Sequence, residues 1–260
     1  IGLLEFMKNK YFFSGEELLE WFKNKVVAIE ISENTVIEAR NILSAYFKKH
    51  FSLDVNVNYF SNINIEDSLK FNVINEIDLC IGNPPYIRAK NLEATYLKYI
   101  KLNYSSCSKG TIDIYFAFIE KYINVAKKLV FITPNSFLTS KSGKVLKEKI
   151  LTGLEYLIDF KEKKIFKDAS VYTCIFMFSK SSNKSDFLYG NDVGNVSLIS
   201  KDKYINYDSE HCDGIYQDVL SGIATLADNV FLIKKDENGK FYAFFDNTQY
   251  EIEKEMVVPY

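Results

Sequence analysis

The residues best suited to carry out chemistry in this chain form one run, Asp78-Leu79-Cys80-Ile81-Gly82-Asn83-Pro84-Pro85-Tyr86. Each proline fixes its own φ angle and keeps the preceding residue out of the helical region. Asn83 and Pro84 are therefore held extended after an apolar strand, and they offer an amide oxygen and a backbone carbonyl oxygen beside the ring of Tyr86. Two fixed acceptors next to an aromatic face suit a planar amino group, whose lone pair they would direct toward an electrophile. An ordinary tight turn after a strand is the alternative interpretation.

Helices and short apolar strands alternate around this run. Ser14 and Glu17 have the spacing of a capping box, and Ser32 is placed to cap the next helix. A helix is predicted at 113–126, and strands are predicted at 25–30, 55–60, 77–81, 129–133, 154–160 and 172–178. This alternation predicts an α/β fold, with a parallel sheet and helices on both faces. Asn83 would then lie at the carboxyl end of a strand, where open α/β sheets bind ligands.

The composition excludes several classes of protein. The 260 residues are 47% hydrophobic and 25% charged, which is enough to bury a core and untypical of a disordered chain. The four cysteines include no CxxC pair and there are two histidines, so we expect neither a disulfide framework nor a metal site. No apolar run approaches the roughly 20 residues that cross a bilayer, and no signal-peptide pattern opens the chain. We therefore predict a cytoplasmic protein without membrane association.

Positive charge is concentrated in two windows. Residues 87–110 contain five basic residues and one acidic residue, and residues 141–167 contain eight lysines and four acidic residues. Each window carries +4, so the rest of the chain carries −10 of the total net charge of −2. This asymmetry is consistent with a surface that binds an acidic polymer, and equally with solvated, lysine-rich helix faces.

Further motifs follow one another along the chain in a fixed order. They are Val26–Glu30, Glu66–Leu69, Asn83–Tyr86, Asp113–Glu120, Phe131–Ser136, and Lys164–Phe166 followed by Val171–Thr173. Together they resemble the gamma-type, type IIG-like adenine-specific DNA methyltransferases of restriction–modification systems, over nearly the whole chain. Asn-Pro-Pro-Tyr also occurs in other amino-group methyltransferases, and its combination with the later phenylalanine is much more specific.

The resemblance implies a fold, a reaction and partners. The fold would be a Rossmann-like sheet of an S-adenosylmethionine-dependent methyltransferase, with residues 1–200 as the catalytic domain and residues 201–260 as a linker and the beginning of a DNA target-recognition domain. The reaction would transfer a methyl group from the cofactor S-adenosylmethionine to the exocyclic amino group of a flipped adenine. The macromolecular partner would be double-stranded DNA, and the oligomeric state stays open.

The resemblance also assigns roles to single residues. The catalytic motif would be Asn83, Pro84, Pro85 and Tyr86. Phe166 would stack on the target base opposite Tyr86, because the amino group of a paired adenine is unreachable inside the duplex. Phe166 lies among several lysines, which suits a stacking residue beside phosphates. The alternative role for Phe166 is to fill the core under the hairpin.

The cofactor residues implied by the resemblance are Gly2, Glu30, Asp67 and Phe118. Glu30 would hold the ribose hydroxyls, as an acid at a strand end commonly does. Asp67 would accept a hydrogen bond from the adenine of the cofactor, and Phe118 would pack against that adenine. Each of the three also has a structural interpretation: Glu30 as a solvated strand-end acid, Asp67 as a turn cap and Phe118 as a core residue.

The chain departs from the family pattern at both ends. The strand before the cofactor loop is absent, and of the glycines in that loop only Gly2 remains, at the head of the first helix. We therefore predict an N-terminally incomplete catalytic domain, whose sheet has an open slot where the first strand would lie. Residues 219–225, 229–233 and 255–260 resemble the entry into a target-recognition domain, which we also expect to be incomplete.

Three other functions remain open at this point. A protein-glutamine or RNA methyltransferase would share the Asn-Pro-Pro-Tyr motif, but would lack the later phenylalanine hairpin. A non-catalytic DNA-specificity module would explain the missing glycine loop, but not the intact Asn83, Pro84 and Tyr86. A dinucleotide-dependent dehydrogenase is the weakest alternative, because no GxGxxG motif opens a βαβ unit.

Overall fold

The computed structural model describes residues 1–74, 76–166, 171–210, 234–235, 241–245 and 248–252. The chain divides into two compact units, Ile1–Asp208 and Ser209–Tyr260, and all predicted site residues belong to the first. The described residues of the second unit form an antiparallel sheet of β9 (Lys234–Lys235), β10 (Phe241–Phe245) and β11 (Thr248–Ile252). The three segments predicted to enter a target-recognition domain, at 219–225, 229–233 and 255–260, lie outside the described residues.

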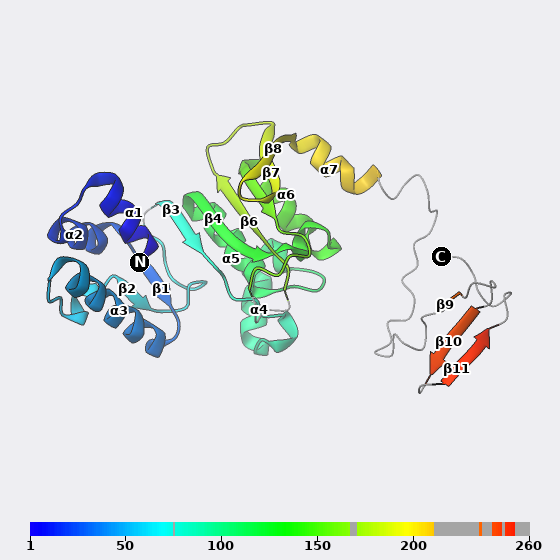
Figure 1. Cartoon of the computed structure of the whole chain (residues 1–260), viewed down its shortest axis with the longest axis horizontal. Helices are drawn as coiled ribbons and strands as arrows, with labels where there is room; N and C mark the ends of the chain where they lie inside the picture. Colours follow the sequence, from blue (N-terminus) through cyan, green and yellow to red (C-terminus); the bar gives the residue numbers. More distant parts are fainter. Residues whose placement is uncertain (75, 167–170, 211–233, 236–240, 246–247, 253–260) are drawn as a thin grey trace. The chain divides into compact units, whose positions relative to one another are not determined.

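The N-terminal part of the first unit has its own helices, strands and hydrophobic core (Figure 1). Its elements are α1 (Gly2–Tyr11), α2 (Gly15–Lys25), β1 (Ala28–Glu30), α3 (Glu33–Phe51) and β2 (Ile63–Ile65). The predicted caps are confirmed: Ser14 and Glu17 form a reciprocal capping box at α2, and the Ser32 side chain accepts from the third residue of α3. β1 and β2 pair in parallel, as expected for strands joined by a helical crossover.

The predicted strand at 55–60 is wrong. Residues Val57–Phe60 form a 3₁₀ helix, and the side chain of Asn56 accepts from the amide of Asn58 at its start. Phe60 is fully buried, with ring centroids 6.0 Å from Phe22 and 6.2 Å from Phe47. The alternating sequence resembles a strand, but asparagine side chains bind nearby backbone amides and thereby favour turns.

Among the described residues, six strands of the first unit form a second sheet in the order β3-β4-β6-β5-β7-β8. Their bounds are β3 (Ile77–Gly82), β4 (Ala126–Pro134), β5 (Leu154–Asp159), β6 (Thr173–Ser179), β7 (Asp186–Asp192) and β8 (Asn195–Ser200). β3 pairs in parallel with β4 and β5 with β7, but β6 is antiparallel to both of its neighbours and β8 is antiparallel to β7. The predicted parallel sheet is therefore mixed, because the β5–β6 and β7–β8 connections join antiparallel neighbours as hairpins do.

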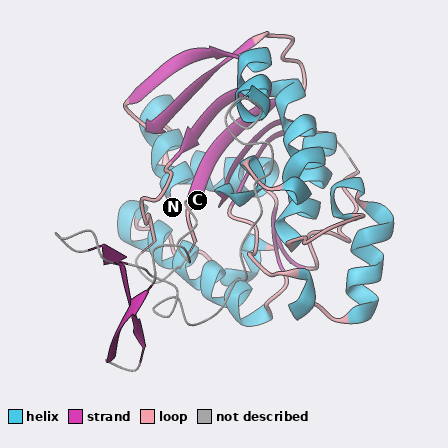
Figure 2. Cartoon of the chain, turned by 90° about the vertical axis from the view of Figure 1, so that its right-hand side faces the viewer, coloured by secondary structure: helices cyan, strands magenta, loops and turns pink. Residues whose placement is uncertain are grey.

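Helices lie against and around this sheet (Figure 2). They are α4 (Ala94–Asn103), α5 (Ile114–Val125), α6 (Lys144–Gly153) and α7 (Lys201–Glu210), with short 3₁₀ helices at Ala89–Asn91, Ser105–Cys107, Asn135–Leu138 and Lys141–Gly143. The core between helices and sheet includes Tyr115 and Ile119 of α5, Phe131 of β4 and Phe176 of β6. The predicted α/β class and the predicted helix at 113–126, which is α5, are confirmed.

β1 and β3 each have a partner on one side only within the described residues. Leu79 and Ile81 of β3 are 47% and 62% exposed, and Val27 and Ile31 on either side of β1 are 64% and 70% exposed. Aliphatic residues on the strands of an α/β sheet are usually buried on both faces. The first strand that the resemblance places in this sheet stays a prediction.

A buried carboxylate, Glu120, joins α5 to the segment that precedes it. It accepts hydrogen bonds from the amide and hydroxyl of Ser105 at 3.1 and 2.9 Å and from the amide of Ser106 at 2.8 Å, and Lys149 Nζ lies 3.4 Å away. Burial by itself raises the pKa of Glu120, but the hydrogen bonds from the two serines outweigh it and hold the pKa below its ordinary value. The ionised form of Glu120 therefore stabilises the fold.

We expect Glu120→Gln to lower the free energy of unfolding at pH 7 by about 1.5–3 kcal/mol, the usual contribution of a hydrogen bond to a charged group. Because the folded pKa is below 4.5, this contribution is fully present above pH 4.5 and is lost as the pH falls through the folded value. Urea denaturation at a series of pH values should therefore show the two proteins converging in acid. The control Glu148→Gln, at an exposed position of α6, should keep the wild-type pH dependence. A difference between wild type and Glu120→Gln that is constant at every pH would contradict this account.

Candidate active site

The motif Asn83–Tyr86 follows β3 directly, at the carboxyl end of the strand. Asn83 and Pro85 are exposed, Pro84 is buried and Tyr86 is half-buried. The preceding Gly82 pairs with Phe131 of β4, and a Cβ on Gly82 would lie 2.9 Å from the Phe131 ring. The absence of a side chain at Gly82 thus lets β3 approach that ring closely. The motif is anchored by buried neighbours and is presented at the end of the sheet.

The hydroxyl of Tyr86 is directed back at the motif. It donates to Asn83 Oδ1 at 2.5 Å and to the backbone oxygen of Ile132, in β4, at 3.2 Å. Burial raises the pKa of Tyr86 to about 12, so the hydroxyl stays protonated and remains a donor at neutral pH. In this structure the phenol therefore donates to the amide oxygen of Asn83, one of the two acceptors predicted for an amino group.

The residues after the motif are tied to the start of α5. Residues 87–89 run antiparallel to residues 112–114 through two backbone hydrogen bonds of 2.9 Å and a bridge between Arg88 and Asp113. Burial raises the pKa of Asp113, and the nearby Arg88 opposes this shift. The ring of Tyr86 also lies edge-on to Tyr115 of α5, with centroids 6.2 Å apart. These contacts fix the motif against the helix that carries Phe118.

Two of the predicted cofactor residues end neighbouring strands. Glu30 is the last residue of β1 and pairs with Ile65 of β2, and Asp67 follows β2 by two residues. Glu30 accepts from the amide of Ser32 at 2.9 Å, and Asp67 Oδ1 accepts from the amide of Leu69 at 2.9 Å. Asp67 therefore does cap its own turn, as its structural interpretation supposes. The two carboxylates nevertheless lie at the same edge of the β1–β2 sheet.

The turn that carries Asp67 is held by α4 and α5. Lys121 Nζ donates to the backbone oxygens of Ser68 and Phe71 at 2.7 and 2.6 Å. The hydroxyl of Tyr96 in α4 donates to Asp67 Oδ1 at 3.1 Å. Phe118 is half-buried and lies on α5 three residues before Lys121, on the same helix face. The structure thus brings Phe118 to the side of α5 that binds the Asp67 turn.

Gly2 is the predicted cofactor residue with the least structural support. It is the first residue of α1 and is exposed, and a Cβ added there would meet no atom within 4 Å. Packing in this structure therefore does not require a glycine at this position. Its assignment to the cofactor stays a prediction.

The predicted hairpin around Phe166 is confirmed as the connection between the antiparallel strands β5 and β6. Phe166 is 37% exposed, and residues 161–166 are all exposed. An exposed phenylalanine in this connection is available for stacking and does not fill the core. Its role toward a base stays a prediction.

Two residues at the ends of β4 and β5 form a side-chain pair that the sequence does not predict. Asn135 Nδ2 donates to Asp159 Oδ1 at 2.9 Å and to the backbone oxygen of Lys161 at 3.3 Å. Asp159 is buried, with 8% of its surface exposed. Asn135 falls within the motif Phe131–Ser136 and Asp159 is a strand-end acid, but their pairing joins residues 24 positions apart and is visible only in the folded chain.

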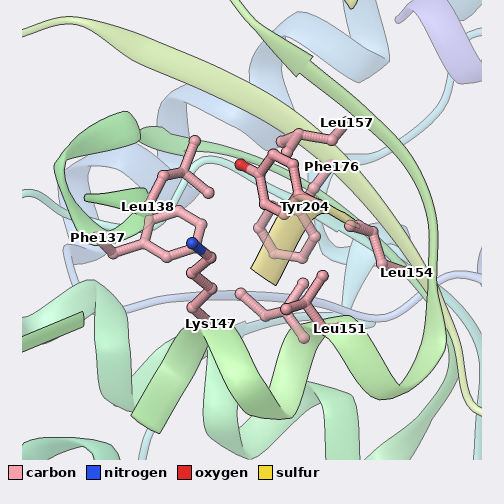
Figure 3. Close-up of a pocket in the computed structure, with 9 residues that line it drawn as sticks. Phe137, Leu138, Lys147, Leu151, Leu154, Leu157, Phe176 and Tyr204 are labelled. Carbon is pink, nitrogen blue, oxygen red and sulfur yellow. The ribbon is translucent and has the colours of Figure 1, made fainter. Parts of the chain in front are cut away.

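An apolar pocket lies between α6 and the sheet (Figure 3). It is lined among others by Phe137, Leu151, Leu157, Phe176 and Tyr204, and it shares no residue with the predicted site. In the described part of the chain, no group of three or more His, Cys, Asp and Glu side chains is arranged to hold a metal ion. No helix in that part is long and apolar enough to cross a membrane.

Comparison with known sequences identifies relatives of restriction–modification systems. The family model of the Eco57I restriction-modification methylase matches residues 6–166, more than half of the chain. The type II restriction enzyme and methyltransferase RM.Eco57I of Escherichia coli is 28% identical over 226 residues, which are 71% of this chain and 22% of that protein. The type II methyltransferase M.HincII of Haemophilus influenzae is 29% identical over 147 residues, which are 54% of this chain and 28% of that protein. The chain thus spans less than a third of the length of these relatives.

Two solved structures share the fold of this chain. The chain resembles the DrdV–DNA complex with a TM-score of 0.59 and 15% identity, over 82% of this chain and 27% of that one. It also resembles a nuclease-deletion mutant of the type ISP restriction-modification enzyme LlaGI in complex with a DNA substrate mimic, with a TM-score of 0.56 and 15% identity, over 80% of this chain and 21% of that one. At this level of identity the likeness shows a shared fold.

We expect Gly82→Ala to lower the free energy of unfolding by about 1–3 kcal/mol, because an added methyl group in a filled site forces its neighbours to shift. The loss should be smaller in a Phe131→Leu background, where the aromatic atoms that the new methyl group meets are gone. Urea denaturation of the four proteins of this double-mutant cycle measures the coupling. Equal losses in both backgrounds would show that Phe131 is not the group that requires a glycine.

Proposed function

The chain belongs to the Eco57I restriction-modification methylase family, and on this premise we propose that it is the methyltransferase part of a restriction–modification enzyme. It transfers a methyl group from S-adenosylmethionine to the exocyclic amino group of a flipped adenine in double-stranded DNA. The observation that carries this proposal is the placement of Asn83, Pro84, Pro85 and Tyr86 at the carboxyl end of β3, with Asn83 exposed and its support buried.

In the proposed reaction the protein acts mainly by positioning. Asn83 Oδ1 and the backbone oxygen of Pro84 accept the two N–H groups of the adenine amine, which turns the nitrogen lone pair out of the base plane. S-adenosylmethionine supplies a sulfonium methyl group, which is already a strong electrophile. Since an electrophile and a nucleophile held in line react without a covalent enzyme intermediate, orientation supplies most of the rate enhancement. The extra proton on the product nitrogen is lost to solvent.

The residues at the end of the β1–β2 sheet fit the proposed cofactor. Glu30 and Asp67 are carboxylates at the ends of neighbouring strands, and carboxylates are suitable acceptors for a ribose diol and for an adenine amino group. Phe118 lies on the side of α5 that binds the Asp67 turn, where its half-buried ring can pack against the adenine of the cofactor. Gly2 at the start of α1 completes the proposed set.

The proposed DNA substrate is supported by exposed positive charge and by the exposed Phe166. Lys90, Lys98, Lys101 and Lys109 after the motif are exposed, as are the lysines at 161, 163 and 164. Lysines neutralise phosphates, and an aromatic side chain among them gives an extruded base a surface to stack on. Tyr86 and Phe166 would hold that base from its two faces. Sequence specificity is proposed to depend on the target-recognition domain that begins within residues 201–260.

We expect Asn83→Ala to abolish methyl transfer, because it removes one of the two acceptors that orient the amine. Binding of S-adenosylmethionine should be nearly unchanged, since Asn83 is separate from the proposed cofactor residues. The measurement is transfer of a tritiated methyl group to unmethylated DNA, with cofactor binding measured in parallel by equilibrium dialysis. The matched control Asn24→Ala removes an exposed asparagine side chain from α2 and should keep wild-type activity. Wild-type activity of Asn83→Ala would remove Asn83 from the mechanism.

Phe166→Ala should lower kcat/KM for DNA roughly 5- to 150-fold, since stacking of one base on an aromatic side chain contributes about 1–3 kcal/mol. Phe166→Tyr keeps an aromatic ring and should retain most of the activity. Phe12→Ala is the control, because Phe12 is 88% exposed and lies in another part of the unit. An alanine variant at Phe166 that is as active as the Phe12 control would exclude stacking on this ring.

A further inference from the structure

The carboxyl end of β4 lies between the strand that leads into Tyr86 and the strand that follows the Phe166 hairpin. In the sheet, β4 has β3, which precedes Tyr86, on one side and β6, which follows the Phe166 hairpin, on the other. The hydroxyl of Tyr86 donates to the backbone oxygen of Ile132 near this end. Asn135 follows the last residue of β4, and its side chain donates a hydrogen bond to Asp159 at the start of the hairpin. One short stretch of chain, residues 132–135, therefore contacts both Tyr86 and the hairpin that carries Phe166.

Asn135 bonds to both limbs of the hairpin. Its backbone amide donates to the oxygen of Tyr172, on the limb that leads into β6, at 3.0 Å. Its side-chain amide donates to Asp159 Oδ1 at 2.9 Å and to the oxygen of Lys161 at 3.3 Å, both on the limb that leaves β5. The side chain of this one residue thus connects the outgoing limb to the end of β4.

The outgoing limb makes an unusual backbone reversal at this point. Lys161 has a φ of 54°, in the left-handed region that side chains other than glycine rarely adopt. Its amide donates to Asp159 Oδ1 at 3.0 Å, and its carbonyl accepts from Asn135. Hydrogen bonds on both sides of Lys161 therefore stabilise a conformation that the backbone alone disfavours. The direction in which residues 162–166 leave the sheet follows from this reversal.

We propose that Asn135 is a positioning residue that sets the place of Phe166 relative to Tyr86. It holds the reversal at Lys161 through Asp159, and so fixes the width of the gap that receives the base, without touching the base itself. The role in catalysis rests on the proposed function, whereas the role in holding residues 160–166 follows from the contacts alone. A residue that only stabilised the fold would lower the free energy of unfolding and leave the kinetics of the folded enzyme unchanged.

The test compares Asn135→Ala with a matched control, Asn62→Ala. The side-chain amide of Asn62 also bridges two acceptors, the backbone oxygens of Phe22 and Val26 at 3.1 and 2.8 Å, but it lies in the N-terminal part of the unit. Hydrogen–deuterium exchange followed by mass spectrometry measures the opening of residues 160–166 in each protein without DNA or cofactor. Steady-state methylation of unmethylated DNA then gives kcat and the KM for S-adenosylmethionine.

We expect the amides of residues 160–166 to exchange at least about tenfold faster in Asn135→Ala than in wild type, and at the wild-type rate in Asn62→Ala. We expect kcat of Asn135→Ala to fall roughly 10- to 100-fold, with the KM for S-adenosylmethionine within about twofold of wild type, because misplacing a positioning group mainly affects the oriented complex. In the double variant Asn135→Asp/Asp159→Asn the amide and the carboxylate exchange places, so that a donor again faces an acceptor. This double variant should recover part of the lost kcat.

Unchanged exchange in residues 160–166 of Asn135→Ala would overturn the proposal. Faster exchange with a wild-type kcat would overturn it equally, since the held position would then have no consequence for the reaction. A wild-type protein that transfers no methyl group to DNA would refute the proposed function instead. In that case the exchange experiment would still decide whether Asn135 holds the segment.

Discussion

The proposed chemistry depends on one constraint: an amide oxygen and a carbonyl oxygen must be held rigidly at the end of a strand, where a base can reach them. Two prolines supply part of this rigidity along the chain, and packing supplies the rest. Gly82 allows β3 to lie close against Phe131, and the buried Pro84 anchors the motif, while Asn83 stays exposed. Burying Asn83 would place its side-chain amide in an apolar core with unmet hydrogen bonds, so its exposure is also the stable arrangement.

In this structure, the hydroxyl of Tyr86 donates a hydrogen bond to Asn83. A free amide oxygen at the end of the sheet would otherwise be satisfied by water, whereas here the phenol of the same motif occupies it. In the proposed reaction an amino group would bind Asn83 Oδ1 beside or in place of the Tyr86 hydroxyl, since an amide oxygen has two lone pairs. Loss of the hydrogen bond to Asn83 would leave the Tyr86 ring free to face the base. Tyr86 would thus donate a hydrogen bond to Asn83 before the base binds, and would stack on the extruded base afterwards.

Local sequence signals predicted the parts of the fold that depend on neighbours in the chain. The capping box at Ser14 and Glu17, the cap at Ser32 and the strand that leads into Gly82 follow from side chains a few residues apart. The strand predicted at 55–60 is wrong, because Asn56 satisfies a local amide and Phe60 is drawn into a core formed by distant rings. The link between Asn135 and Asp159 could not be predicted, since neither residue type nor spacing indicates which strand ends meet. The proposed catalytic motif was identifiable because the two prolines that stiffen it are consecutive in the sequence.

The central claim is that Asn83 and Pro84 orient the amino group of an adenine in DNA. The most direct test is mass spectrometry of the nucleosides released from unmethylated double-stranded DNA after incubation with the protein and S-adenosylmethionine. The account predicts N6-methyladenine, with the methyl group derived from the cofactor. A product methylated on cytosine, or methylation of RNA or protein in place of DNA, would contradict it.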